Sequence, residues 1–512
     1  MADSRWDAQR GTAADAKAEK SSVDRTADGE NSGSDTNTNR WPDDGVIPAG
    51  EMYDASGNSG KEGDVTAPVT TGNIFSEGGR DYRTMGRWDA TLVLITNQVG
   101  LGILALPAVV RVLGIVPAVI AIIGIGLLST YTAYELLQFY RRHPHVVNLV
   151  DMARLVGGRP LETAMGASLV FDLILTCGSM SVTLSVAFNT ITEHALCTTG
   201  FMGISAFVCF LLCLPRNLHF VARVGIPATI SIVSAVFIVI ISLGVADRPQ
   251  NAPPEWTRAN DVKMFAVGFP NFRDGMNACL NVAFAYAGNV GFVSYMAEMK
   301  DPSRDFMFAA WALQAFTIPL YIIAAVTIYG LAGDYVTSPS LGSAPVIPAK
   351  VAYAVALPCV FASGCVFGHT GIKYMYVVAM KRLGATSELT SRTARSWLVW
   401  VGCAAVFWVL AYLLANAIPI FESILSIASA TFIAWFTFGF SAVLWFNMFW
   451  GREMLTGWRK ISLTVVNALI IAMTLFMNSA GLWSAAMGLQ DVFNNPENSI
   501  NAPFTCADNS IF

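Results

Sequence analysis

The sequence predicts an all-α polytopic membrane protein with eleven transmembrane helices behind a polar N-terminal tail. Of the 512 residues, 54% are hydrophobic and only 13% are charged, and the mean hydropathy is +0.51. Soluble domains carry about 25% charged residues, so this composition argues against a cytosolic enzyme. The charges are also uneven, because residues 1–87 contain 10 basic and 16 acidic side chains whereas the rest contains 22 and 20. With no basic stripe and a net charge of −4, nucleic-acid binding is not expected.

The tail, residues 1–87, is predicted to be disordered and cytoplasmic. It is rich in Asp, Gly, Ser, Thr and Asn and has no apolar periodicity that could build a core. It contains no apolar stretch typical of a signal peptide, so the first membrane segment is expected to direct insertion. A solvated leader is the favoured interpretation. The alternative is a regulatory tail that is ubiquitinated at Lys17, Lys20 and Lys61.

Eleven apolar runs are long enough to cross a bilayer, which requires about 20 residues per helix. The fourth and fifth runs are separated only by Pro215–His219, which we interpret as a tight loop because one helix through both would be twice the needed length. Together the runs form a transporter domain over residues 88–490. They lie near 88–111, 114–140, 161–192, 201–218, 220–246, 276–299, 305–331, 349–381, 395–416, 420–449 and 461–487.

The basic residues predict the orientation. Of the 22 Lys and Arg after residue 87, fifteen fall in loops on the same side as the tail, and cytoplasmic loops carry the excess of positive charge. The N-terminus is therefore expected inside. With eleven spans, the C-terminus and residues 491–512 are then expected outside.

Seven of the nine cysteines fall within predicted spans. The other two, Cys197 and Cys506, both fall on the predicted outer side, where conditions are oxidising. The sequence leaves open whether these two cysteines form a disulfide or remain two free thiols.

Two of the predicted spans contain glycine breaks. The first span carries Gly100 and Gly102 ahead of Pro107, and the sixth carries Gly288 and Gly291. Breaks within a membrane are tolerated only where the freed backbone groups find partners or line a cavity. Five crossings separate the two spans, so they run in opposite directions. Breaks in corresponding places of two inverted halves indicate a transporter site near the bilayer midplane.

Such breaks suit a zwitterion, because free amides attract a carboxylate and free carbonyls attract an ammonium group. Neither break contains an ionisable residue, which favours a neutral amino acid. Close packing of helices through small residues is the alternative. The candidate carboxylate-binding positions are Asn97, Gln98, Gly100, Leu101 and Gly102, and the candidate ammonium-binding positions are Tyr286, Ala287, Gly288 and Asn289.

Three motifs resemble the amino acid/auxin permease family. They are residues 100–107 (GLGILALP) followed by Leu113-Gly114, residues 284–286 with 296–302 (MAEMKDP), and residues 368–376 (GHTGIKYMY). Over residues 80–490 the chain is similar to the fungal neutral amino acid permeases of the Mtr type. The resemblance implies a LeuT-like 5+5 inverted repeat with broken helices 1 and 6, and secondary active uptake of amino acids. Many members carry His just after the glycine of the sixth-helix break, whereas this chain has Asn289.

Ionisable residues inside spans are costly and are functional candidates by default. His369 and Lys373 lie four residues apart on one face of the eighth span, and Asp172 lies in the third. His369 titrates near neutral pH, and Lys373 could replace a coupling cation. We therefore favour a co-transported proton over sodium. A snorkelling Lys373 and a hydrogen-bonded core His369 are the alternatives.

Gating residues are expected on either side of the second break. Glu298 lies at the predicted inner end of the sixth span, where it is a candidate partner for Arg87. Phe284 and Tyr286 are candidates for an outer aromatic lid, with ordinary packing as the alternative.

The sequence thus predicts a proton-coupled symporter of neutral aliphatic and aromatic amino acids. The alternatives are an amino-acid receptor with little net flux, a sodium-coupled transporter and a vacuolar transporter. A channel is disfavoured because no continuous polar helix face is present, and no phosphate-binding loop, metalloprotease or hydrolase motif indicates an enzyme or a primary pump. The expected partners are an amino acid and the lipid bilayer, without a cofactor or metal, most simply in the plasma membrane.

Overall fold

The computed structural model describes residue 83 and residues 85–216, 219–257, 263–385, 388–389, 393–494 and 502–509. Within these residues the regular structure is helical, apart from a single β-bridge between Met85 and Met299. Most of the predicted tail, including Lys17, Lys20 and Lys61, lies outside the described residues.

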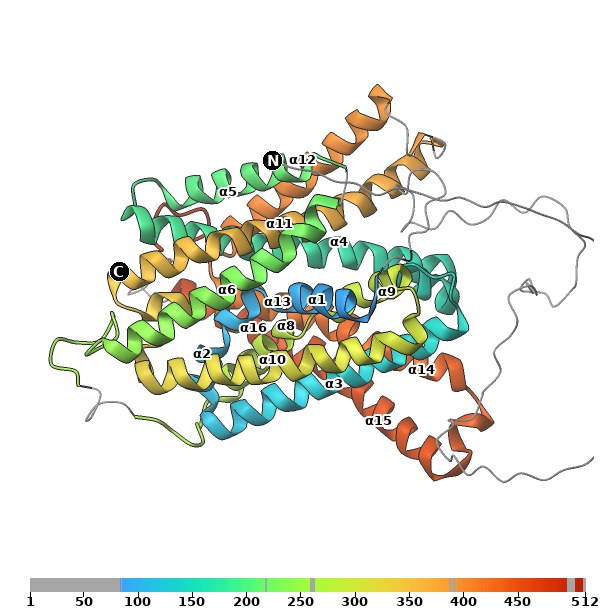
Figure 1. Cartoon of the computed structure of the whole chain (residues 1–512), viewed down its shortest axis with the longest axis horizontal. Helices are drawn as coiled ribbons and strands as arrows, with labels where there is room; N and C mark the ends of the chain where they lie inside the picture. Colours follow the sequence, from blue (N-terminus) through green and yellow to red (C-terminus); the bar gives the residue numbers. More distant parts are fainter. Residues whose placement is uncertain are drawn as a thin grey trace, which may run out of the picture. The chain divides into compact units, whose positions relative to one another are not determined.

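Within the described residues, eight helices are long and apolar enough to cross a membrane. Four of them, α3, α6, α10 and α11, run side by side along the bundle (Figure 1). The eight are α3 (Ile115–Arg142), α4 (Leu149–Thr192), α6 (His219–Val245), α10 (Pro302–Ala332), α11 (Val346–Arg382), α12 (Ala394–Ala417), α13 (Phe421–Ala428) continued by η5 (Ser429–Gly439) and α14 (Phe440–Phe449), and α15 (Gly457–Phe476) continued by η7 (Met477–Gly481) and α16 (Leu482–Asn494).

The first predicted span is broken where the glycines predicted it. It consists of α1 (Arg87–Gln98), the 3-10 turn η1 (Leu101–Leu104) and α2 (Leu106–Leu113), and its two parts are bent by 46°. Pro107 lies in the first turn of α2, a position where its missing N–H leaves no hydrogen bond unmade. Counted as one span, the bent pair raises the candidate crossings to nine.

The sixth predicted span is also divided, into α8 (Phe272–Ala285) and α9 (Asn289–Glu298). The intervening residues Tyr286–Gly288 are outside both helices. The remaining predicted run forms the shorter apolar helix α5 (Thr198–Cys213), and α6 begins at His219, so the predicted tight loop does separate the two.

Two features of the long helices differ from the expectation. Helix α4 begins at Leu149 rather than near residue 161, because a first helical segment continues into the span across a kink at Gly158. Gly158 adopts φ +65°, which only glycine does easily, and Pro160 supplies no N–H to the ladder. The tenth span contains the 11-residue π-helical stretch η5, which hydrophobic periodicity does not reveal.

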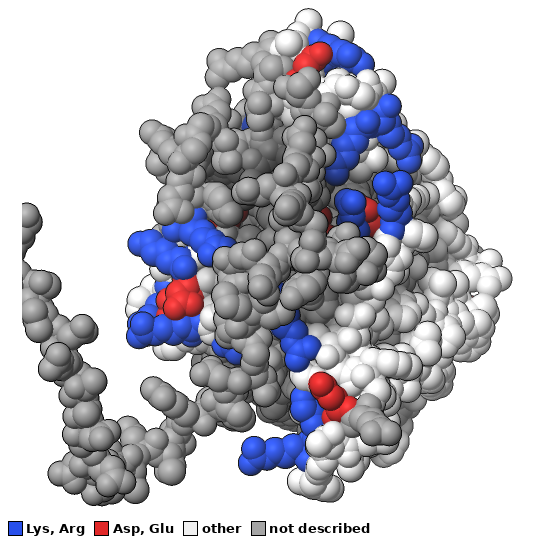
Figure 2. All heavy atoms as spheres, turned by 90° about the vertical axis from the view of Figure 1, so that its right-hand side faces the viewer, with Lys and Arg blue, Asp and Glu red and all other residues white. Residues whose placement is uncertain are grey.

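Figure 2 views the end of the bundle where α3 and α11 end and α10 begins. Lys and Arg side chains are spread around this face, whereas acidic side chains are few. The basic residues at these helix ends include Arg141, Arg142, Arg304, Lys381 and Arg382. This is the end that the charge distribution of the sequence predicts to face the cytoplasm.

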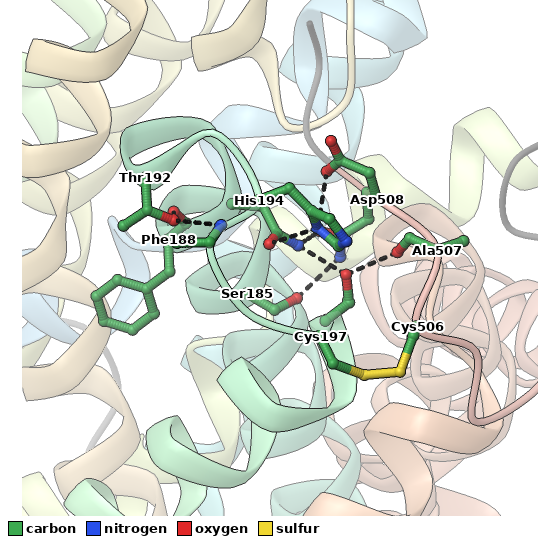
Figure 3. A network of polar contacts seen from close by, with 12 residues as sticks. Ser185, Phe188, Thr192, His194, Cys197, Cys506, Ala507 and Asp508 are labelled. Carbon is green, nitrogen blue, oxygen red and sulfur yellow. Dashed lines mark hydrogen bonds and ion pairs between the residues drawn. A yellow bond between two sulfur atoms is a disulfide. The ribbon is translucent and has the colours of Figure 1, made fainter.

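At the opposite end, the C-terminal segment 502–509 is fastened to the junction of α4 and α5. A disulfide joins Cys197 to Cys506 (Figure 3), which is one of the two states that the sequence left open. The Thr198 hydroxyl donates to the carbonyl of Ala507 at 2.7 Å, and the His194 ring lies 3.5 Å from the Asp508 carboxylate.

A buried amide pair extends this attachment. Asn189 of α4 is fully buried, and its Nδ2 donates to Thr198 Oγ1 at 2.7 Å and to Asn509 Oδ1 at 2.6 Å. Asn509 in turn donates to Ser185 Oγ at 2.9 Å. We call residues 502–509 together with these partners the C-terminal attachment. Its polar side chains satisfy one another, so it holds α4, α5 and the end of the chain in one arrangement.

Candidate substrate site at the helix breaks

The two breaks lie directly against each other. A Cβ on Gly102 would be only 2.6 Å from Cα of Ala285, the last residue of α8. Gly102 is therefore needed because any side chain would collide with the backbone of the second break. Gly100, by contrast, has more space, since a Cβ there would meet only Ser363 of α11 at 3.9 Å.

The predicted site residue Asn97 ties α1 to the second break. Its Nδ2 donates to the carbonyl of Gly288 at 3.1 Å, and its Oδ1 accepts from the Tyr295 hydroxyl at 3.1 Å. Both ends of the amide are thereby engaged with protein groups. Asn97 consequently sets the distance between the breaks.

The neighbouring Gln98 has a different environment. Its side chain is 6% exposed, and neither Oε1 nor Nε2 has a hydrogen-bond partner among the described residues. It lies at the second break, because a Cβ on Gly288 would be 3.1 Å from Gln98 Oε1. Buried amides normally have partners, so this side chain is a strong candidate to bind a substrate.

Leu101 and Gly102 begin η1 and are both buried. The first N–H groups of a helix have no intrahelical acceptor. At the other break, the N–H of Ala287 donates to the Phe284 carbonyl at 3.1 Å, as in a turn. The start of η1 therefore lies beside the turn of the second break, because Gly102 is in close contact with Ala285.

Asn289 does not offer its side chain to this site. Its Oδ1 accepts from the Ser129 hydroxyl at 2.9 Å, and its Nδ2 donates to Thr132 Oγ1 at 2.8 Å and to the Thr437 carbonyl at 3.2 Å. These partners belong to α3 and η5, and the side chain is fully buried among them. The amide of Asn289 therefore anchors α9, and the binding of the ammonium group by backbone carbonyls near Ala287–Asn289 stays a prediction.

The two predicted lid aromatics also point into the protein. Tyr286 is fully buried, its ring lies 5.4 Å from that of Tyr321, and a Cβ on Gly126 of α3 would be 3.0 Å from it. Phe284 is half-buried against the same core. Neither lines the cavity described next, so an aromatic lid formed by them is not present in this conformation.

Tyr321 of α10 is a site residue that the sequence reasoning missed. Its hydroxyl lies 3.1 Å from the Gln98 carbonyl and 3.0 Å from the Ala285 carbonyl. These are the last residues of α1 and α8, whose carbonyls have no intrahelical donor. A tyrosine in an apolar 31-residue helix carries no sequence signal beyond a polar atom that needs a partner.

A cavity of about 680 Å³ lies at the end of the bundle where α2 ends and α8 begins. Asn281 and Ser426 on its wall are hydrogen-bonded to each other at 3.1 Å. Its wall consists of apolar side chains interrupted by several polar and charged ones. The polar and charged lining residues are Arg111, Asp274, Asn277, Asn281, Glu422, Ser423 and Ser426.

The opposite end is closed by backbone contacts. The N–H of Met85 donates to the Glu298 carbonyl at 3.1 Å, and the N–H of Lys300 donates to the Met85 carbonyl at 3.0 Å. The segment before α1 is therefore fastened to the end of α9. The structure accordingly combines an open cavity at one end of the broken helices with a closed contact at the other.

The predicted Arg87–Glu298 ion pair is absent among the described residues in this conformation. Arg87 instead lies 3.8 Å from Asp305, in the first turn of α10. The Glu298 carboxylate interacts with the Lys373 ammonium of α11. The contact of Glu298 with the segment before α1 is made by its main chain.

The other ion-coupling candidates have separate neighbours. His369 Nε2 lies 3.0 Å from the Pro215 carbonyl, so this nitrogen carries the hydrogen, and the ring lies 5.2 Å from Trp400. Asp172 is buried on α4, and its Oδ1 has no hydrogen-bond partner among the described residues. His369 therefore has a hydrogen-bonded core position, whereas the charge of Lys373 is close enough to Glu298 at the end of α9 to act on it electrostatically.

The chain is similar to known transport proteins. Residues 83–486 match the family model described as transmembrane amino acid transporter protein. The chain is 30% identical to the N amino acid transport system protein of Neurospora crassa over 84% of this chain and 90% of that protein. It is 28% identical to a transmembrane transporter of Fusarium pseudograminearum over 86% and 91% of the two chains. A solved mutant of the Eremococcus coleocola manganese transporter has the same fold, with a TM-score of 0.50, 14% identity and coverage of 83% and 91%.

Proposed function

Because the chain belongs to the transmembrane amino acid transporter family, the amino acid/auxin permeases, we propose that it takes up neutral aliphatic and aromatic amino acids by proton-coupled symport. It is an integral membrane transporter rather than an enzyme. The observation that carries the proposal is the meeting of two broken helices at a buried amide, Gln98, which has no hydrogen-bond partner among the described residues.

In the membrane, the proposed arrangement has eleven spans in a 5+5 inverted repeat, with the N-terminus inside and the C-terminus outside. The eight long helices, the bent pair α1–α2, the divided pair α8–α9 and the short helix α5 correspond in order to the eleven predicted runs. The disulfide supports an outer location for the C-terminal attachment, because disulfides persist in oxidising surroundings. The plasma membrane is the proposed location, with the vacuolar membrane as the alternative.

The substrate would bind as a zwitterion between the breaks. Its carboxylate would accept from the free N–H groups at the start of η1 and from Gln98 Nε2. Its ammonium group would donate to backbone carbonyls near Ala287, where the second helix is interrupted. Charged substrates are disfavoured because residues 96–107 and 284–291 contain no Asp, Glu, Lys or Arg.

During alternating access, the end of the bundle that is now open would close, and the end that is now closed would open. The substrate would enter through the 680 Å³ cavity and leave after the Met85–Met299 bridge has opened. Lys373 lies beside Glu298 at the inner end of α9. A proton that moves on and off this pair, with His369 nearby, would couple the proton gradient to that opening.

Uptake into proteoliposomes tests the proposal. Labelled leucine and phenylalanine would be offered with an inward proton gradient, with a sodium gradient and with neither. Accumulation with the proton gradient alone, lost in Lys373→Met, supports symport. Accumulation that requires sodium would refute proton coupling, and saturable binding without accumulation would indicate a receptor.

A further inference from the structure

The Tyr321 hydroxyl lies where the ends of two half-helices converge. Helix α1 ends at Gln98 and α8 ends at Ala285, and the terminal carbonyls of both point at this hydroxyl, at 3.1 and 3.0 Å. The C-terminal end of a helix carries a partial negative charge. Two such ends brought together repel each other unless a donor or a cation lies between them.

In transporters with broken helices, these carbonyls are the groups that coordinate a coupling cation. Here the protein supplies its own donor. A tyrosine hydroxyl has one hydrogen to give, and Tyr321 holds it within reach of both carbonyls from a fully buried position on α10. The ring is fixed against Tyr286 at 5.4 Å, so the hydroxyl has little freedom to move away.

We propose that Tyr321 is a positioning residue of the transport site, whose hydroxyl, instead of a bound sodium ion, joins the two broken helices. The inference rests on the proposed function for its effect on transport. Together with Asn97, it explains how both breaks keep their spacing although Gln98 makes no side-chain hydrogen bond within the described residues. It also predicts that uptake does not require sodium.

Tyr329 provides a matched control on the same helix. It is also fully buried, and its hydroxyl also bonds to two backbone groups, the Lys263 carbonyl at 3.2 Å and the Phe265 N–H at 3.3 Å. Those groups belong to the segment before α8 and not to the breaks. Tyr329→Phe therefore also removes one tyrosine hydroxyl and a similar number of hydrogen bonds, but it does so away from the breaks.

The experiment compares the full-length wild type, Tyr321→Phe and Tyr329→Phe in proteoliposomes. The KM and the maximal rate per molecule are measured for leucine, with sodium or choline as the bulk cation. We expect Tyr321→Phe to raise the KM about tenfold, the effect of one lost hydrogen bond, and Tyr329→Phe to leave it within about twofold. A KM for Tyr321→Phe equal to that of Tyr329→Phe, or wild-type uptake that needs sodium, overturns the proposal.

A second readout does not depend on transport. Cys279 of α8 is half-buried, and Cys403 of α12 is a half-buried cysteine away from the breaks. If the hydroxyl joins the breaks, Tyr321→Phe should increase the rate at which a maleimide labels Cys279 but not Cys403, and Tyr329→Phe should change neither. Should the wild type neither carry nor bind leucine, the proposed function fails, and the Cys279 labelling rate alone then decides the role of Tyr321.

Discussion

The helix breaks and the C-terminal attachment both place polar groups inside an apolar bundle, but they differ in the hydrogen-bond partners that these groups find. In the C-terminal attachment, Asn189 and Asn509 bond to each other and to hydroxyls, and a disulfide closes the group. At the breaks, Gln98 is left without a partner in the described part of the chain. An unpaired buried amide costs free energy, and a protein retains that cost where a ligand completes the hydrogen bonds.

This difference distinguishes a rigid part of the protein from a part that moves during transport. We call the C-terminal attachment with α4 and α5 the frame, and the broken helices the moving site. Helices α4 and α5 are held to the end of the chain by covalent and polar links. The segment before α1 is held to α9 by two backbone hydrogen bonds, which can be broken and remade. We therefore expect substitutions at the breaks to affect transport at normal stability, and substitutions in the C-terminal attachment to affect stability at normal transport.

The largest effect on transport is expected for Gly102→Val. The new side chain would begin 2.6 Å from the backbone of Ala285 and force the two breaks apart. We expect uptake to be abolished while the protein still reaches the membrane, because the helices on either side remain intact. Gly124→Val on α3 is the matched control, since a Cβ there meets nothing within 4 Å. Uptake by Gly102→Val at the level of Gly124→Val would mean that the breaks do not form the site.

Cys197→Ser is expected to have the largest effect on stability. The disulfide links residues 309 positions apart, and loss of such a link costs about 2–4 kcal/mol. Thermal unfolding of the purified protein should show the loss, whereas the KM for leucine should stay within about twofold of the wild-type value. Cys403→Ser, at a free cysteine, is the control. A large change in KM would contradict the separation of frame and site.

Gln98→Met tests whether the unpaired amide at the breaks serves substrate binding rather than stability. The variant keeps the size of the side chain but loses both polar atoms. We expect the KM to rise about tenfold, equivalent to about 1.4 kcal/mol, because the substrate loses a hydrogen bond. The melting temperature without substrate should not fall, since Gln98 makes no side-chain hydrogen bond within the described residues. A lower melting temperature with an unchanged KM would identify Gln98 as a structural residue.

The sequence predicted the parts of the site that depend on backbone alone. Gly100, Gly102 and Pro107 weaken a helix through the backbone itself, so the position of the break could be predicted from the local sequence. The contact of Gly102 with Ala285 joins residues 183 positions apart in the chain. No local pattern shows which helix faces a glycine.

Side-chain roles were harder to predict, because they depend on rotation about the helix axis. Asn289 was expected at the substrate and instead anchors α9 to Ser129, and Glu298 was assigned to Arg87 although its carboxylate lies near Lys373. Tyr321 was missed because its two acceptors belong to helices that end elsewhere in the sequence. The breaks could be predicted, whereas helix faces needed the structure.

The smallest effect is expected for Glu193→Gln, beside the C-terminal attachment. Glu193 follows α4, and Lys350 lies 2.6 Å from its carboxylate, so the hydrogen bond and the charge of Lys350 hold the pKa of this carboxyl below its usual range. A depressed folded-state pKa contributes stability that is present above the ordinary carboxyl pKa, about 4.3, and is lost as the pH falls through the lowered value. The Glu193 side chain is 79% exposed, so only a barely measurable difference in melting temperature is expected at neutral pH.

The useful measurement on Glu193→Gln is therefore the pH profile of uptake. Because the lowered pKa keeps the Glu193 carboxylate charged when the medium is only mildly acidic, this part of the frame should not respond to the pH change of the proposed proton gradient. Glu193→Gln and the wild type should show the same dependence of uptake on outer pH, whereas Lys373→Met should lose it. A shifted profile in Glu193→Gln would show that the outer frame takes part in proton coupling, and the division between a rigid frame and a moving site would then be wrong.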